Sequence, residues 1–204
     1  VSNSGAITSR HGDVILIGKA VNNSGSLSAE HGSASLNAGR NVYLVPAQSG
    51  GRILVNGGGG HGNATNSGMI AAAQAQINAA GGNVYALSGN NGGIIRATGT
   101  STIGGHVWLT SNTGTVTNSG TVSSVNANGS GGAITARATD ITLGGALGAS
   151  ATQRHKSGGT ISAIAKDTAQ ITGKMFAQVV AHGKGGFVET SVEHVHVANG
   201  ARIN

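Results

Sequence analysis

The sequence predicts an all-β fold: a right-handed parallel β-helix of about nine turns, in which each turn of main chain stacks on the turn before it. Three observations predict this fold. A short Asn/Ser/Gly motif recurs along the chain, a second motif opens with paired glycines or His-Gly, and aromatic and charged residues are scarce. We expect residues 1–204 to form a single β-helix segment that is part of a longer array.

The first motif is a polar corner followed by a short strand of alternating apolar residues. It occurs at 1–9 (VSNSGAITS), 21–29 (VNNSGSLSA), 65–71 (TNSGMIA) and 116–124 (VTNSGTVSS), with a looser copy at 90–97 (NNGGIIRA). Glycine and asparagine tolerate the left-handed backbone conformations that sharp corners need. If equivalent residues stack, the corner asparagines form a ladder of amide hydrogen bonds along the axis. The predicted corner residues are Asn3, Asn23, Asn66, Asn118, Gly5, Gly25, Gly68 and Gly120.

The second motif opens a strand after a glycine pair or a His-Gly pair. The first two His-Gly openings lie at 11–12 and 31–32, whereas the last three glycine pairs begin at Gly131, Gly158 and Gly185 and are more widely spaced. The same opening recurs at 81–82 and 104–105. The period therefore drifts from about 20 to about 27 residues, as expected if strands and corners are fixed and loops vary in length. Strands one turn apart would pair in parallel about 4.8 Å apart, and the right hand is the usual one for parallel crossovers.

The composition favours a narrow, layered core over a compact sandwich. Aromatic residues make up 2% of the chain and charged residues 9%, and there are 37 glycines and no cysteine. An ordinary domain has about 25% charged residues. Small apolar side chains can fill a narrow core, and their regular alternation argues against disorder. Residues 71–80 are the only stretch with passable helical character, and they fall where the repeat predicts a strand.

The two ends of the chain predict contacts beyond the segment itself. The chain begins within a repeat, and another strand is starting at 200–204. Because an uncapped solenoid exposes strand edges, we expect either a longer array or ends that contact other chains, including end-to-end self-association.

Enzyme chemistry has little support in the sequence, and we expect a non-catalytic protein. Asp140 and Asp167 form the best candidate cluster, because they are one repeat period apart and could stack on neighbouring turns, with His194 one turn further. Such a cluster would suit a carbohydrate-binding or carbohydrate-cleaving β-helix, in which two groups must reach one bond. The favoured alternative is that these are solvated residues that flank strands.

His194 and His196 form the candidate metal site. They lie two residues apart and so share one face of a strand, with Val195 and Val197 on the inward face. Two imidazoles could hold Zn²⁺ or Cu²⁺ if a third ligand came from the turn below, but zinc usually takes three or four protein ligands. Surface decoration is the favoured interpretation, haem capture is a further alternative, and we predict no cofactor.

The net charge of +6 restricts the class of partner. The 12 Lys and Arg residues are spread along the chain, more densely after Arg154. Nucleic-acid modules combine clustered basic residues with aromatic platforms, so we expect no nucleic acid partner. A mildly basic stripe could attract anionic polysaccharide or lipopolysaccharide at low salt; the favoured alternative is that these charges keep the chain soluble.

Four sequence segments resemble those of a known family: 12–18 (GDVILIG), 38–44 (AGRNVYL), 185–191 (GGFVETS) and 200–203 (GARI). With the Asn corners between them, they resemble large secreted exoproteins of the filamentous haemagglutinin type, over nearly all of the chain. The resemblance implies a bacterial exoprotein exported by two-partner secretion, with an outer-membrane secretion partner, that folds outside the cell into a long β-helical shaft. The family's secretion domain carries Asn-Pro motifs; this chain has none, and its sole proline is Pro46. The segment would therefore lie downstream of that domain.

The resemblance and the residues together predict a function. We expect a structural shaft or filament segment of a secreted bacterial adhesin, located outside the cell at the cell surface. Its partners would be host or bacterial surface receptors or polysaccharide. The alternatives are a carbohydrate-binding or carbohydrate-cleaving β-helix that uses Asp140 and Asp167, and a haem- or metal-capturing exoprotein that uses His194 and His196.

Overall fold

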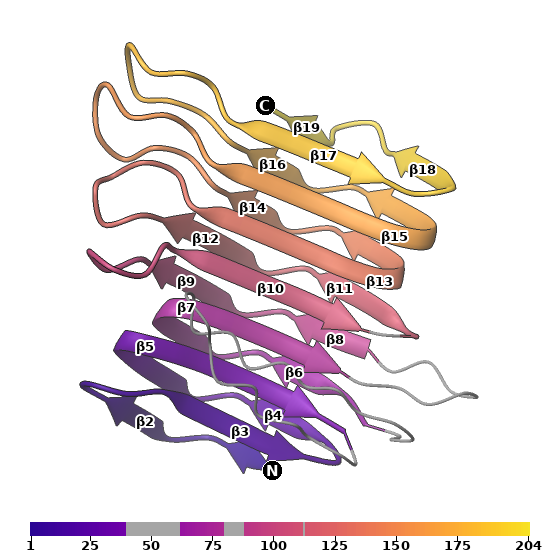
Figure 1. Cartoon of the computed structure of the whole chain (residues 1–204). Helices are drawn as coiled ribbons and strands as arrows, with labels where there is room; N and C mark the ends of the chain where they lie inside the picture. The colour runs from indigo at the N-terminus through magenta and orange to yellow at the C-terminus, as the bar shows by residue number, and fades with distance from the viewer. Residues whose placement is uncertain (40–61, 80–87, 112) are drawn as a thin grey trace.

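The computed structural model describes residues 1–39, 62–79, 88–111 and 113–204, and in these ranges the chain forms strands and no helix (Figure 1). The strands are β1 (Ser2–Asn3), β2 (Ala6–Ser9), β3 (Val14–Gly18), β4 (Val21–Asn23), β5 (Ser26–Ala38), β6 (Ala64–Asn66), β7 (Met69–Ala79), β8 (Ser88–Asn91), β9 (Ile94–Thr98), β10 (His106–Ser111), β11 (Thr115–Asn118), β12 (Thr121–Val125), β13 (Ala133–Leu143), β14 (Ala146–Gly148), β15 (Thr160–Ile171), β16 (Lys174–Phe176), β17 (Phe187–Ser191), β18 (His194–Val197) and β19 (Arg202–Ile203).

These strands belong to one large sheet, and every pairing between them is parallel. Each strand pairs with its equivalent one repeat later, as in the series β9, β12, β14, β16 and β19. Figure 1 shows the resulting stack, in which the colour advances steadily from the N-terminal to the C-terminal end. The predicted all-β fold with parallel, solenoid-like strand pairing is therefore confirmed.

Residues one repeat apart lie in straight files because the strands pair in register. One file runs through the sheet as Ile7, Leu27, Ile70, Ile95, Val122, Leu147, Met175 and Ile203. Its six inner members are almost fully buried, whereas Ile7 and Ile203 at the two ends are 37% and 45% exposed. Each buried methylene contributes about 0.8 kcal/mol, so neighbouring turns stabilise one another through this file.

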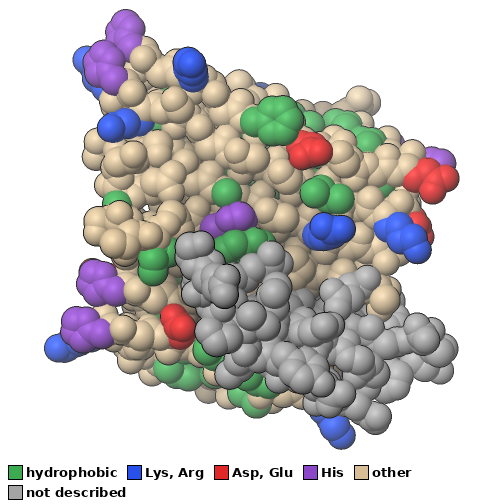
Figure 2. All heavy atoms as spheres, viewed as in Figure 1, with side chains coloured by type: hydrophobic (Ala, Val, Ile, Leu, Met, Phe, Trp, Pro, Cys, Tyr) green, Lys and Arg blue, Asp and Glu red, His purple; other side chains and the backbone are tan. Residues whose placement is uncertain are grey.

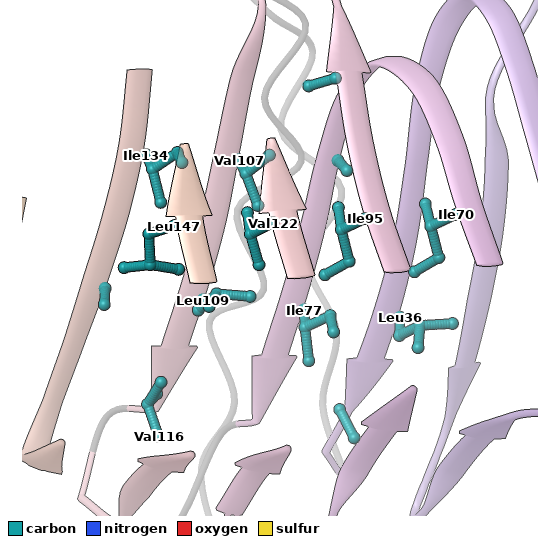
Figure 3. Close-up of a cluster of buried hydrophobic side chains, with 14 of the residues drawn as sticks. Leu36, Ile70, Ile77, Ile95, Val107, Leu109, Val116, Val122, Ile134 and Leu147 are labelled. Atoms are coloured by element: carbon teal, nitrogen blue, oxygen red, sulfur yellow. The ribbon is translucent and has the colours of Figure 1, made fainter. Parts of the chain in front are cut away.

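A second apolar file packs beside the first in the interior. It contains Leu16, Leu36, Ile77, Leu109 and Ala136 in consecutive registered strands. Figure 3 shows Leu36, Ile77 and Leu109 in one row and Ile70, Ile95, Val122 and Leu147 in the row next to it. The core is therefore built from Ala, Val, Ile and Leu, which the composition predicts, together with Met175.

The stretch with passable helical character is a strand. Residues 71–79 lie in β7, which pairs with β5 on one side and with β9 and β10 on the other. Neighbouring strands supply backbone partners on both sides, and this tertiary context overrides the helix propensity of alanine. The strand predicted after the glycine pair at 81–82 lies outside the described residues.

The spacing of the repeats between β4 and β6 is longer than the sequence predicts. β4 pairs with β6, so that Asn23 lies opposite Asn66, 43 residues further along the chain. The other steps of this file are 20, 25 and 27 residues, inside the predicted range. The described residues contain no helix that could span a membrane.

Candidate functional site

The corner asparagines form a continuous ladder of side-chain hydrogen bonds. The Nδ2 of each residue donates to the Oδ1 of the residue one turn later, at 2.8 Å from Asn3 to Asn23, 2.8 Å from Asn23 to Asn66, 2.9 Å from Asn66 to Asn91 and 2.8 Å from Asn91 to Asn118. Each Nδ2 also contacts the carbonyl oxygen two residues along its own chain, at 3.2 to 3.3 Å. These buried amides are engaged with one another, so the ladder joins turns and presents no free group to a ligand.

Asn91 is a ladder member that the motif comparison did not select. It belongs to the looser copy at 90–97, where Gly92 replaces the serine of the other corners. The signal that identifies it is the spacing of Asn and Gly. Asn91 precedes Gly93 by two residues, as Asn3 precedes Gly5 and Asn23 precedes Gly25.

The ladder ends at Asn118, and the same file continues with apolar side chains. Asn118 pairs in register with Leu143, Leu143 pairs with Ile171, and Ile171 pairs with Val197. Leu143 and Ile171 are almost fully buried. The interior file therefore changes from hydrogen-bonded amides to hydrophobic packing part-way along the stack, without a break in the strand register.

The corner glycines are required by close approach between turns. A Cβ built on Gly25, Gly68, Gly93, Gly120, Gly145 or Gly173 would collide with the carbonyl oxygen of the glycine one turn below. Gly5 has nothing within 4 Å of such a Cβ. The left-handed backbone predicted for these glycines is wrong. The positive-φ residues of the described chain lie elsewhere, at Gly129, Gly200, His155 and His182.

The candidate carboxylate cluster is not aligned as expected. The register between β13 and β15 shifts between Ala138 and Asp140, so that Asp140 pairs with Thr168 and not with Asp167. His194 also pairs with Thr168, which places it two turns from Asp140 in the same file. The predicted stacking of Asp140 on Asp167 is therefore wrong by one residue, and Asp167 lies exposed on the outer surface.

The candidate metal pair, His194 and His196, lies on β18. Val195 and Val197 pair in register with the buried Ala169 and Ile171, but all four residues of β18, the two histidines included, are exposed. His194 Nε2 lies 3.8 Å from Glu193 Oε1, and both side chains are exposed. Within the described ranges no group of three or more His, Cys, Asp or Glu side chains could hold a metal ion.

Histidines of neighbouring turns stack in pairs along one edge, an arrangement that was not predicted. His11 and His31 have ring centroids 6.1 Å apart with planes at 6°, and His155 and His182 have centroids 5.4 Å apart with planes at 17°. The members of each pair are separated by one repeat period in the sequence, so the period was the signal. On β10, the rings of His106 and Trp108 stack with their centroids 3.7 Å apart.

The comparisons with known proteins add no relative. No protein-family model, curated protein or solved structure matches this chain significantly.

Proposed function

We propose that the chain is a structural shaft segment of a secreted bacterial surface adhesin, a right-handed parallel β-helix of about nine turns. It mediates attachment to receptors or polysaccharide on host or bacterial surfaces and carries out no catalysis. The single observation that carries this proposal is that buried side chains lie in registered files along the stack. One file holds the amides from Asn3 to Asn118 and then aliphatic side chains, and the file through Ile95, Val122 and Leu147 is apolar.

A shaft needs stiffness along its axis, and the contacts between turns supply it. Each turn is bonded to the next by backbone hydrogen bonds, by the buried files and, from Asn3 to Asn118, by the amide ladder. Such a stack behaves as a quasi-one-dimensional array, in which each repeat contacts only its neighbours. The resemblance of the sequence phrases to secreted exoproteins supports the extracellular location and the outer-membrane export partner.

The carbohydrate-cleaving and haem-capturing alternatives have weaker support from the geometry. Cleavage needs two groups that reach one bond, and the register shift places Thr168, and not Asp167, opposite Asp140. Haem or metal capture would rest on His194 and His196 alone, both exposed at one end of the stack.

The shaft function is tested by measuring attachment, sugar release from a polysaccharide and haem binding in the same variants. Beads coated with the protein are scored for attachment to a protein-matrix surface. We expect the double variant Asp140→Asn/Asp167→Asn and the double variant His194→Ala/His196→Ala to attach as the unmodified chain does, because neither pair contributes to contacts between turns. Gly120→Ala, which disturbs the stack, should reduce attachment.

Two readouts decide between the three functions. Sugar release from a polysaccharide by the unmodified chain, lost in the carboxylate variant, would replace the shaft by a carbohydrate-active protein. A Soret shift with added haem that disappears in the histidine variant would replace it by haem capture.

A further inference from the structure

Two long connections lie side by side at one edge of the stack. Residues 149–159 join β14 to β15, and residues 177–186 join β16 to β17; both form loops on the same side in Figure 1. Backbone hydrogen bonds hold one connection on the other, from Ala151 N to Gln178 O at 2.8 Å, His155 N to Ala181 O at 2.9 Å and Gly158 N to Lys184 O at 3.0 Å. The two connections therefore form a fixed, two-layered surface.

The backbone of this surface is held in an unfavourable conformation at two equivalent positions. His155 has φ of 60° and His182 has φ of 54°, and they are the positive-φ non-glycine residues of the described chain. A residue with a Cβ pays a free-energy cost for this conformation, and such residues cluster at functional sites. The two residues in this conformation are also the ones whose exposed imidazole rings stack, with ring centroids 5.4 Å apart.

Positive charge gathers around this histidine pair without a compensating acid. Arg154 and Lys156 lie on the connection of residues 149–159, and Lys184 lies on that of residues 177–186. The preceding connection, residues 126–132, carries no titratable side chain. The six carboxylates all lie outside these three connections, at Asp13, Glu30, Asp140, Asp167, Glu189 and Glu193. Figure 2 shows blue and purple side chains together at the edge near the C-terminal end, with no red beside them in this view.

We propose that this cationic edge, formed by Arg154, His155, Lys156, His182 and Lys184, binds a linear anionic polysaccharide. The guanidinium of Arg154 can hold a carboxylate or sulfate in a bidentate manner, and the two lysines supply point charges on neighbouring turns. Repeating anionic groups along a sugar chain match the positive charges on these two neighbouring connections. This proposal rests on the proposed function and specifies the class of polysaccharide, and the surface of the chain, through which attachment would occur.

The chemistry of the edge favours a polysaccharide over the two other common polyanions. Proteins that bind single-stranded nucleic acid add aromatic platforms on which bases stack, and neither connection contains Phe, Tyr or Trp. A membrane-binding surface has a broad apolar face, whereas the one large exposed apolar side chain recorded in these connections is Val180.

The test is alginate binding by the whole chain, measured calorimetrically at low salt. We expect the triple variant Arg154→Gln/Lys156→Gln/Lys184→Gln to bind alginate at least about tenfold more weakly, since several charge contacts are lost together. The matched control, Arg137→Gln/Lys166→Gln/Lys174→Gln, removes the same charge from exposed positions on β13, β15 and β16 and should change the affinity less than about threefold. Equal losses in the two variants, or no binding by the unmodified chain, would overturn the proposal. A circular dichroism spectrum checks that both variants are folded.

A second measurement isolates the histidines. His155→Asn/His182→Asn, chosen because asparagine tolerates positive φ, removes two exposed imidazoles that can hydrogen-bond to the polymer. This variant should bind alginate more weakly, and His11→Asn/His31→Asn, at the other stacked pair, should leave the affinity unchanged. The reverse result would contradict the proposal.

Two further ligands separate the classes of polyanion. Duplex DNA or anionic lipid vesicles that bind as tightly as alginate, with the same loss in the Arg154 triple variant, would contradict the assignment to polysaccharide. Failure of alginate binding leaves the shaft function standing, because attachment to the protein matrix is scored without any polysaccharide.

Discussion

Replacing Gly120 by alanine is expected to destabilise the protein by about 3 kcal/mol, at the upper end of the usual cost of overpacking. The new Cβ would collide with the carbonyl oxygen of Gly93 on the turn below. Backbone cannot move aside as a flexible side chain can, so two turns of the stack must separate or bend. At about 2–4 °C per kcal/mol for a chain of this size, the midpoint of thermal unfolding should fall by about 6–12 °C.

Gly5→Ala is the matched control for this substitution. Gly5 occupies the same corner position, but a Cβ there has nothing within 4 Å, and its backbone φ is not in the left-handed region. The thermal midpoint of Gly5→Ala should therefore stay within a degree or two of the unmodified chain. If both variants lose the same stability, the glycines are required for a reason other than contact between turns.

Asn66→Ala is expected to cost about 3–5 kcal/mol, because it cuts the ladder in the middle. Asn66 accepts from the Nδ2 of Asn23 and donates to the Oδ1 of Asn91, and all three side chains are buried. The substitution leaves a buried donor with weaker partners and a buried acceptor without its donor, and it opens a void. The measurement is the urea midpoint of unfolding, followed by circular dichroism.

Asn118→Leu provides the contrast at the end of the ladder. Asn118 takes part in one ladder bond, from Asn91, and its next neighbour in the file is Leu143. Leucine therefore extends an apolar file that already exists, and the cost should be about 1–2 kcal/mol. A larger loss for Asn118→Leu than for Asn66→Ala would mean that the amide bonds are not what holds these turns together.

The repeats predict most of the fold, because each repeat has one way to bury its apolar residues. The motif at 65–71 places Ile70 between Leu27 and Ile95, and this pairing makes residues 71–79 a strand despite their alanines. The ladder of Asn3, Asn23, Asn66 and Asn118 follows from the same alignment, with Asn91 added.

The features that sequence reasoning missed depend on local offsets that a period does not contain. One extra residue in β15 moves Asp167 out of line with Asp140, although the two are a full repeat apart in sequence. The requirement for Gly120 depends on how closely two backbones approach, and the left-handed conformation of His155 and His182 depends on how two loops stack. These are properties of neighbouring turns in contact, so they become visible only in three dimensions.

The most direct test of the stacked-turn arrangement is the bridging of paired cysteines by a short bifunctional thiol reagent. The chain has no cysteine of its own, so each introduced pair reports one distance. Arg96 and Ser123 lie opposite each other on β9 and β12, and the folded monomer of Arg96→Cys/Ser123→Cys should be bridged internally. Arg96→Cys/Arg137→Cys, which places the second thiol on β13 in a different series of strands, should keep two free thiols. Bridging of the second pair and not of the first would contradict the register on which the fold, the ladder and the proposed shaft all depend.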